Sequence, residues 1–316
     1  MPMRYRLTLI FLVPFCLVFR AFADTPAVQV AQLPNKITLH YTSQGSGPAM
    51  VFVPGSISDY MYWNDEVTYF SKYYHVINYS RRYDYPNHNL TRAGYSSKSD
   101  AEDLAELIKL LKLENVIVVG NSSGALAALY LVINHPELVS KLVLAQPFAV
   151  SLLENLDGAD AANGRKIKNA LEQRMAIPMR KAFKAGNNEQ GLQTYFNYLS
   201  SSKSAWKRLP LAEQHEALRN SYEWEVMMTA GVLFPSIDKK AIMQLKTPVL
   251  LLSGGKSYHF TTFTDAELHR IIPNNSQVIF KEASNQIWRQ RTSLCEEQTM
   301  NFLKGSIANH ALIKEK

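Results

Sequence analysis

The fold of this chain is decided by the stretch Val116-Ile117-Val118-Val119-Gly120-Asn121-Ser122-Ser123-Gly124-Ala125. Its first four residues are apolar and β-branched, which favours a strand buried in a parallel sheet. The motif Gly-x-Ser-x-Gly follows, and residues 125–132 then form an apolar run with helix-forming Ala and Leu. The pattern predicts a buried strand that turns sharply into a helix.

Ser122 lies at the sharpest point of this predicted turn. A strand, a Gly-x-Ser-x-Gly turn and a helix in this order are typical of a nucleophile elbow, which exposes the serine hydroxyl above the sheet. The backbone N–H of Ser123 lies at the helix start, where it can donate a hydrogen bond to an oxyanion. Ser122 is therefore the predicted nucleophile position, and a plain strand–turn–helix without chemistry is the alternative.

Strand-like and helix-like segments alternate along most of the chain. The predicted strands cover residues 36–41, 49–53, 74–79, 116–119, 141–145, 248–252 and 277–280. Such alternation predicts an α/β protein, with a mostly parallel sheet that has helices on both faces. Ligands bind such sheets at the carboxyl ends of the strands, where Ser56, Ser122 and Gln146 fall. Two capping boxes, at residues 99–102 and 293–296, predict helix starts.

Residues 148–245 interrupt this alternation with a helix-prone stretch that fits a helical cap over the sheet. The predicted organisation is a signal peptide at 1–23, a first part of the core at 24–147, the cap at 148–245, a second part of the core at 246–306 and a tail at 307–316. The 316 residues suffice for one large α/β domain with such an insertion, or for two domains.

The N-terminal residues have the pattern of a secretory signal peptide. A charged start precedes an apolar run at residues 7–19, and Ala21-Phe22-Ala23 has the small residues of a cleavage site. We expect cleavage after Ala23 and a periplasmic or secreted protein with no stable membrane anchor. The alternative is an uncleaved N-terminal anchor. It stays open because Arg20, a charged residue, stands between the apolar run and the cleavage site, where signal peptides rarely have one. Cleavage would leave Cys295 as the single cysteine, so no internal disulfide is expected.

Composition and spacing exclude several classes of function. The formal net charge of +7 falls to +4 when the three arginines of the predicted signal peptide are removed. Such a mild, dispersed charge gives no indication of nucleic-acid binding. No pair of His or Cys has the spacing of metal ligands, and residues 120–124 are too short for a dinucleotide fingerprint. We expect neither a metal nor a cofactor, and the expected partner is a small-molecule acyl substrate or ligand.

Further stretches accompany the Gly-x-Ser-x-Gly motif. They are Val51-Phe52-Val53-Pro54-Gly55-Ser56 with Asp59, Tyr60 and Trp63, Tyr79-Ser80-Arg81-Arg82 with Tyr85-Pro86-Asn87, Ala101-Glu102-Asp103-Leu104, and His135-Pro136-Glu137-Leu138-Val139. With these, the chain from about residue 36 to 303 resembles the α/β-hydrolase superfamily, in particular exported bacterial serine hydrolases of the AB hydrolase-1 type. The resemblance implies the α/β-hydrolase fold, a serine nucleophile, a base histidine and an acid. It also implies an oxyanion hole made by the backbone N–H of Ser123 and one near Ser56.

The chain departs from that family's pattern at the positions of the base and the acid. The base histidine commonly follows the last strand in an Ala-Ser-His context, and here the sequence is Ala283-Ser284-Asn285. The acid commonly follows the strand that ends at Leu252, where Gly254-Gly255-Lys256-Ser257 offers no carboxylate. In the similar subgroup a Glu ends the strand after the elbow, and here that residue is Gln146. Pro54 also stands where relatives carry a histidine.

These replacements remove the side chains that would accept the proton of the serine and stabilise the protonated base. A serine hydroxyl becomes a good nucleophile only when a base takes its proton. The Asn285 amide cannot accept that proton, and Gln146 cannot carry the charge that stabilises an imidazolium. Asn285 is thus a degenerate base position and Gln146 a degenerate acid position. A network of Ser122, Asn285 and Gln146 could keep its shape and be nearly inert.

Two functional hypotheses follow. The first is a serine hydrolase of small, fairly apolar carboxylic esters, in which His259 acts as a relocated base because it comes shortly after the strand ending at Leu252. The second is a non-catalytic relative that binds a small molecule or a protein partner in the capped pocket. The alternative for His259 is a polar loop residue, ahead of a helix predicted from about residue 264 to 272. An imidazole within about 4 Å of the Ser122 hydroxyl would support the first hypothesis.

Overall fold

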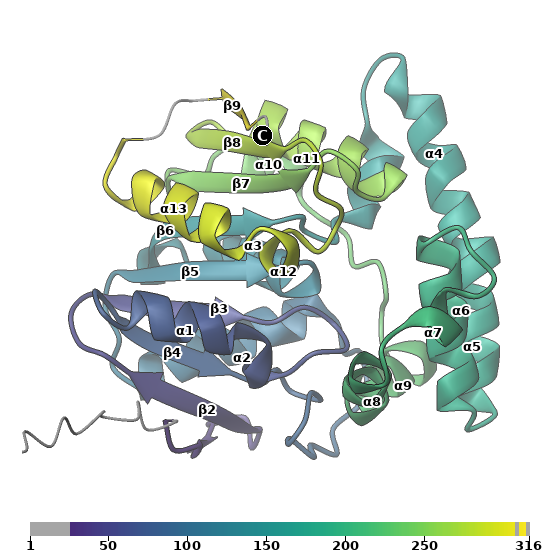
Figure 1. Ribbon diagram of the computed structural model, residues 1–316, viewed down its shortest axis with the longest axis horizontal. Coiled ribbons are helices and arrows are strands. Elements are labelled where there is room, and N and C mark those ends of the chain that lie inside the picture. Colours follow the sequence, from purple (N-terminus) through teal and green to yellow (C-terminus); the bar gives the residue numbers. More distant parts are fainter. Residues whose placement is uncertain (1–25, 307–309, 314–316) are drawn as a thin grey trace, which may run out of the picture.

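The computed structural model of the chain describes residues 26–306 and 310–313 (Figure 1). The predicted signal peptide lies outside the described residues. Among the helices of the described part, none has the length and apolar character needed to cross a membrane.

A single nine-stranded sheet lies at the centre of the described chain, in the order β1-β2-β4-β3-β5-β6-β7-β8-β9. The strands are β1 (Gln29–Gln32), β2 (Thr38–Gln44), β3 (Ala49–Val53), β4 (His75–Tyr79), β5 (Val116–Asn121), β6 (Val139–Ala145), β7 (Val249–Gly254), β8 (Asn275–Phe280) and β9 (His310–Ile313). β2 pairs antiparallel with β1 and β4, and all other pairs are parallel. The prediction of a mostly parallel sheet is confirmed, whereas β1 and β9 were not predicted.

Helices cover both faces of this sheet (Figure 1). One face carries α2 (Ser97–Leu110), α3 (Ser123–Asn134), α10 (Lys239–Ile242) and α11 (His259–Ile271), and the other carries η1 (Tyr60–Trp63), α1 (Asn64–Phe70), α12 (Ile287–Gln290) and α13 (Thr292–Leu303). Alternate strand residues reach the two cores, so that Val51 and Val53 contact the first and Met50 and Phe52 the second. This two-residue period is that of strands buried on both faces.

A helical insertion between β6 and β7, here called the cap, lies beside the carboxyl ends of the strands (Figure 1). It comprises η3 (Val150–Asn155), α4 (Asp160–Leu171), η4 (Glu172–Ala176), α5 (Ile177–Lys184), α6 (Asn188–Leu199), α7 (Ala205–Arg208), α8 (Leu211–Arg219) and α9 (Ser221–Thr229). A third apolar cluster holds these helices together through residues such as Met175 and Trp224. The same cluster includes Tyr83 and Phe260 of the core, so the cap packs directly on the core.

Three helices begin earlier than the sequence predicted. Ser96 caps α2 in a capping box with Ser99, so the predicted box at 99–102 lies inside the helix. α13 begins one residue before Ser293, after Arg291, and the predicted box at 293–296 therefore caps nothing. α11 begins at His259 instead of near residue 264. Polar residues cluster at each of these starts, and the packing of the chain decides at which of them the helix begins.

Asp265 of α11 carries a buried carboxyl that makes the stability of this fold pH-dependent. Burial raises the pKa of Asp265 from 3.8 to about 7, and a hydrogen bond from the Ser253 hydroxyl at 2.7 Å opposes that rise. Between about pH 3.8 and pH 7 the folded chain therefore holds a proton that the unfolded chain releases. The folded state binds more protons in this window, so this group lowers stability as the pH rises through it.

Asp265→Asn is expected to raise the free energy of unfolding at pH 8 by about 2 kcal/mol. The substitution removes a linkage penalty of at most about 4 kcal/mol, while the new amide nitrogen remains unpaired at a cost of about 1–3 kcal/mol. Urea unfolding at pH 4 and pH 8 measures the difference. At pH 4 the native carboxyl is largely protonated, so no comparable gain is expected. An equal effect at both pH values would contradict this explanation.

Candidate active site

Ser122 lies where β5 turns into α3, as the sequence predicts. Its φ of 52° and ψ of −117° place it in a sparsely populated region that costs on the order of 1–3 kcal/mol for a non-glycine residue. Its N–H donates to the Ala145 carbonyl at 2.9 Å, and its carbonyl accepts from the Phe148 N–H at 3.1 Å. The end of β6 and the residues after it therefore hold the sharp turn that presents Ser122 to a cavity.

Close backbone packing explains the two glycines around Ser122. A Cβ on Gly124 would lie 2.3 Å from the Pro54 carbonyl oxygen, and one on Gly120 would lie 2.7 Å from the Ala125 Cα. Any side chain at either position would displace the backbone of β3 or α3. The turn itself requires both glycines, so their presence does not report whether the serine is catalytic.

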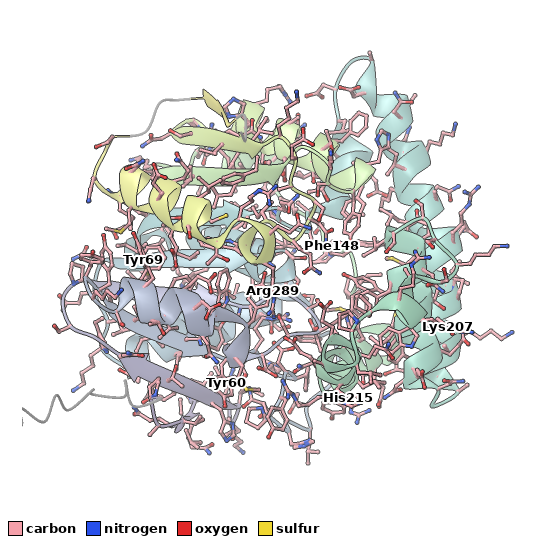
Figure 2. All side chains as sticks on the ribbon, viewed as in Figure 1. Tyr60, Tyr69, Phe148, Lys207, His215 and Arg289 are labelled. Carbon is pink, nitrogen blue, oxygen red and sulfur yellow. The ribbon has the colours of Figure 1, made fainter. Side chains whose placement is uncertain are left out.

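A cavity of about 130 Å³ opens above Ser122, between the strand ends and the cap. Its lining includes Ser56, Asn121, Ser122, Gln146, Tyr258, Phe260, Thr261 and Asn285 from the core and Tyr195, Phe196, Leu199, Glu213, Glu216 and Ala217 from the cap. Figure 2 shows Phe148 and Arg289, which also line it, on the side of the sheet that faces the cap. Its wall combines aromatic and apolar side chains with a comparable share of polar and charged ones, a mixture that can hold a small polar molecule with an apolar part.

Asn285 lies on the cavity wall, in the loop after β8. Burial raises the pKa of the neighbouring Tyr258 phenol, and a hydrogen bond with the Asn285 side chain opposes that rise. The base position is thus occupied by the Asn285 amide, which contacts the neutral phenol of Tyr258. Neither group can take the proton of the Ser122 hydroxyl near neutral pH.

Gln146 directly follows β6 and has a left-handed φ of 49°, and its side chain ties three segments together. In the amide orientation that satisfies both ends, its nitrogen donates to the backbone carbonyl of Asn285 at 2.9 Å. Its oxygen accepts from the Gly254 N–H at 3.3 Å and from the Ser257 hydroxyl. Ser257 belongs to the stretch after Leu252, which is one of the two places where the resemblance would put the acid, and Gln146 is the other. Two neutral side chains, Gln146 and Ser257, are therefore hydrogen-bonded to each other where a carboxylate would be expected. Gln146 reaches the backbone of Asn285, whereas a side-chain network was predicted.

His259 does not reach the cavity. It is the first residue of α11, its side chain is exposed, and its ring packs edge-on against Phe263 with 5.1 Å between the centroids. Phe260 and Thr261, the next residues of α11, line the cavity instead. Among the described residues, no histidine lines it. The fold therefore brings the predicted residues Ser122, Asn285 and Gln146 to one cavity and leaves His259 outside it, packed on Phe263.

Two backbone N–H groups near Ser122 lack a protein acceptor. Within the described part of the chain, neither the Ser56 N–H nor the Ser123 N–H donates a hydrogen bond. Ser123 is the first residue of α3, so its N–H belongs to the positive end of the helix dipole. A Cβ on Gly55 would lie 3.3 Å from the Ser122 Cβ, which shows how closely the Ser56 peptide approaches. The two N–H groups can bind negative charge that forms beside Ser122.

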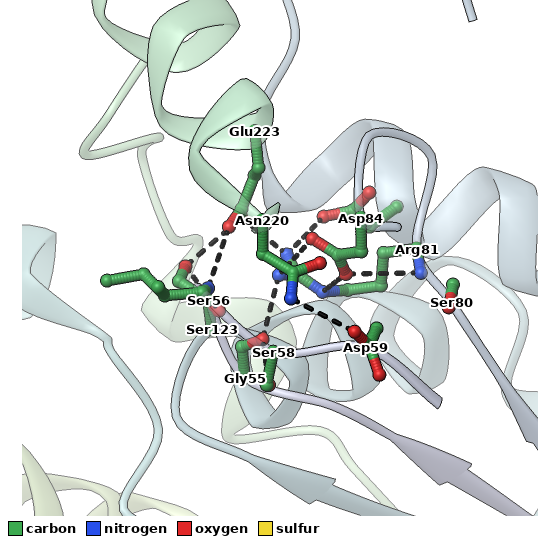
Figure 3. A network of polar contacts seen from close by, with 12 residues as sticks. Gly55, Ser56, Ser58, Asp59, Ser80, Arg81, Asp84, Ser123, Asn220 and Glu223 are labelled. Carbon is green, nitrogen blue, oxygen red and sulfur yellow. Dashed lines mark hydrogen bonds and ion pairs between the residues drawn. The ribbon is translucent and has the colours of Figure 1, made fainter. Parts of the chain in front are cut away.

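Beside the elbow lies a buried ionic network that no motif in the sequence indicates (Figure 3). Arg81 is 1% exposed, and its guanidinium contacts Glu223 at 2.8 Å, Asp100 at 3.1 Å and Asp84 at 3.1 Å. Burial disfavours the charged guanidinium, but the Asp84 and Glu223 carboxylates raise the pKa of Arg81 well above its usual value. Burial also raises the pKa of Asp84 well above its usual range and that of Asp100 to about 6, against the attraction of Arg81. One cation therefore holds three carboxyl groups together.

Glu223 of α9 links this network to the cavity. The Ser56 hydroxyl donates to its Oε1 at 3.1 Å, and the Ile57 N–H donates to its Oε2 at 3.3 Å. The Ser56 Oγ also lies 2.8 Å from the Ser123 Oγ. Arg81 belongs to a segment that carries the resemblance, but Glu223 lies in the cap, where no motif indicates function. Only the packing of the cap on the core brings it to Ser56.

Arg289 of α12 and Glu216 of α8 meet on the cavity wall at 3.4 Å. The guanidinium of Arg289 also lies 4.6 Å over the ring of Tyr62. The Arg289 side chain is 49% exposed, and ion pairs of this kind are typically worth about 0–1 kcal/mol. This contact therefore joins the cap to the core only weakly.

Sequence comparisons find relatives of this chain. A family profile described as alpha/beta hydrolase fold matches residues 48–284. The uncharacterized hydrolase YraK of Bacillus subtilis (strain 168) is 27% identical over 229 residues, which cover 69% of this chain and 74% of YraK. The (E)-2-((N-methylformamido)methylene)succinate hydrolase of Acinetobacter baylyi is 34% identical over 116 residues, which cover 36% of this chain and 43% of that protein.

Solved structures share the fold of this chain. The enol-lactonase from Burkholderia xenovorans LB400 has a TM-score of 0.67 at 18% identity, over 87% of this chain and 100% of that one. The esterase from Exiguobacterium antarcticum has a TM-score of 0.67 at 18% identity, over 88% of this chain and 100% of that one. Since the family profile also spans most of the core and the whole cap, the chain belongs to the α/β-hydrolase fold family.

Proposed function

We propose that this chain binds a small, fairly apolar carboxylic ester or related acyl compound in the capped cavity, and that it hydrolyses such compounds slowly or not at all. The composition of the cavity wall carries this proposal. Ser122 and Ser56 lie there, and Ser123 follows Ser122 directly. Within the described chain neither the Ser56 N–H nor the Ser123 N–H has a protein acceptor, whereas the base position is Asn285 and no described histidine lines the wall. The site can hold an acyl group, but the residue at its base position, Asn285, cannot activate the serine.

The class of ligand follows from the size and chemistry of the cavity. A volume of about 130 Å³ suits a short compound. Phe148, Phe196 and Leu199 supply apolar surface, and the N–H groups near Ser122 can bind a carbonyl oxygen. Structural relatives with the same fold are named an esterase and an enol-lactonase, which supports an ester or lactone as the ligand class.

Slow turnover follows from the amide at the base position and from a cavity wall on which no described histidine lies. Loss of a catalytic triad costs a factor of about 10⁶ in kcat, and binding with an oxyanion hole then leaves about 10³ over water. A relocated base would have to lie within reach of the Ser122 hydroxyl. The exposed position of His259 at the start of α11 gives no support to that alternative.

Calorimetric titration with 2-hexanone, a non-hydrolysable isostere of propyl acetate, tests the proposed binding. We expect a Kd of about 0.1–1 mM for a ligand of this size. Phe148→Ala should weaken binding about tenfold, because it removes an aromatic wall of the cavity. Tyr69→Ala is the matched control, since Tyr69 is also a partly buried aromatic residue, does not line the cavity and lies well away from Phe148 (Figure 2).

Two outcomes of the titration would contradict the proposal. One is no heat of binding for 2-hexanone and for propyl acetate with the folded native protein. The other is an equal loss of affinity in Phe148→Ala and Tyr69→Ala, which would mean that the ligand binds elsewhere.

A further inference from the structure

We propose that Glu223, a residue of the cap, is a positioning residue for the oxyanion hole, and that Arg81 holds it in place. The proposal rests on the proposed function for its ligand and adds a residue that touches neither Ser122 nor the acyl group. The oxyanion hole here means the Ser56 N–H and the Ser123 N–H. Figure 3 shows Glu223 descending from its helix between Ser56 and Arg81.

The Glu223 carboxylate contacts the Ser56–Ile57 segment of the hole directly and the Ser123 segment only through the Ser56 hydroxyl. It accepts hydrogen bonds from the Ser56 hydroxyl at 3.1 Å and from the Ile57 N–H at 3.3 Å. Because the Ser56 proton is directed to the carboxylate, the Ser123 hydroxyl is the donor in its 2.8 Å contact with Ser56. A chain of donors thus runs from Ser123 through Ser56 to a single carboxylate.

Ile57 needs such support because of its backbone conformation. Its φ is 65°, which is a genuine outlier for a β-branched residue. Strained residues of this kind persist only where their surroundings hold them. The Ile57 N–H has its hydrogen bond with Glu223, so the cap supplies part of the force that keeps the turn after β3 in this shape.

Arg81 fixes the peptide that carries the Ser56 N–H. Its Nη2 donates to the Gly55 carbonyl at 3.0 Å, and the Ser58 hydroxyl donates to the same oxygen at 2.7 Å. In a trans peptide the N–H points opposite to the C=O, so two donors on the Gly55 oxygen direct the Ser56 N–H the other way. The Nη1 of Arg81 holds Glu223 at 2.8 Å, so one guanidinium orients both the peptide and the carboxylate.

Glu223→Gln tests the proposal with little change in shape. The carboxylate accepts from three donors, namely Arg81, Ser56 and Ile57, whereas an amide offers one oxygen and turns its NH₂ group toward at least one of them. Glu225→Gln is the matched control, because Glu225 lies on the same helix but is partly exposed and pairs with Arg92 at 3.0 Å.

The probes are propyl methylphosphonate, a tetrahedral monoanion, and 2-hexanone, its neutral planar counterpart. An oxyanion hole binds developed negative charge more strongly than a neutral carbonyl. We expect Glu223→Gln to weaken phosphonate binding at least about tenfold and to leave 2-hexanone within about twofold. Hydrogen exchange of the Ile57 amide should become at least about tenfold faster, and Glu225→Gln should change none of these quantities.

The outcomes separate this proposal from the proposed function. If the native protein and Glu223→Gln bind both probes equally well, the positioning role of Glu223 is wrong and the proposed function stands. If the native protein binds neither probe, the proposed function is wrong, and the exchange of the Ile57 amide decides the role of Glu223. Unchanged exchange would then overturn the positioning role, and faster exchange in Glu223→Gln alone would support it.

Discussion

Asn285→His combined with Gln146→Glu is expected to raise kcat/KM for propyl acetate at least about a hundredfold over the native protein. An imidazole at position 285 would stand on the cavity wall that includes Ser122 and would take the proton of its hydroxyl. A carboxylate at position 146 would keep the donors from Gly254 and Ser257. Its other oxygen would lose the hydrogen bond to the residue 285 carbonyl and would turn to the imidazole, where it would stabilise the imidazolium. General-base assistance is worth about 10²–10⁴, so a hundredfold gain is the lower end of the expected range.

The single substitutions and a third variant serve as controls for this gain. Asn285→His alone should give a smaller gain, because loss of the acid from an intact triad costs about 10⁴ in kcat. Gln146→Glu alone should give none. Ser122→Ala added to the double variant should abolish the gain. A folded double variant with the native rate would show that the cavity does not present an ester to Ser122, contrary to our expectation.

Arg81→Met is expected to lower the free energy of unfolding at pH 8 by about 3–5 kcal/mol. Its guanidinium is the shared partner of Asp84, Asp100 and Glu223, all of which are buried. Removing one member of a buried ionic group leaves the others uncompensated, which is far more costly than the loss of an exposed pair. Urea unfolding at pH 8 measures the change.

Arg92→Met is the matched control for this effect. Arg92 pairs with Glu225 at 3.0 Å with 42% of its side chain exposed, so its loss should cost under about 1 kcal/mol. The cost of Arg81→Met should shrink below about pH 5, because burial raises the pKa of Asp100 to about 6 and this carboxyl then needs no cation. Equal costs for the two substitutions would contradict the assigned role of the network.

The sequence predicts the core of the fold well because each signal is local. The apolar run before Ser122 and the Gly-x-Ser-x-Gly motif predict β5, the elbow and α3 where the structure places them. Helix starts are predicted less well, because several neighbouring serines can cap and the local pattern does not rank them. β9 was missed because it gains its stability from pairing with β8, a contact that sequence periodicity does not contain.

The site is predictable only as far as its motifs extend. Ser122, Asn285 and Gln146 follow strands, so their strand positions bring them to one cavity. The position of His259 was not predictable, because it depends on where α11 begins. Glu223 lies in a segment without a motif and meets Ser56 at a sequence separation of 167 residues. Contacts of this kind depend on how the cap packs and leave no local signal.

The central claim is that Ser122 occupies the nucleophile position but has no base to activate its hydroxyl. A fluorophosphonate probe tests this claim most directly. It is applied to the native protein, to Ser122→Ala and to the double variant Asn285→His with Gln146→Glu. We expect no Ser122-dependent labelling of the folded native protein within minutes, and clear labelling of the double variant. Rapid labelling of the native protein that Ser122→Ala abolishes would contradict the account, because it would require a base within reach of the Ser122 hydroxyl.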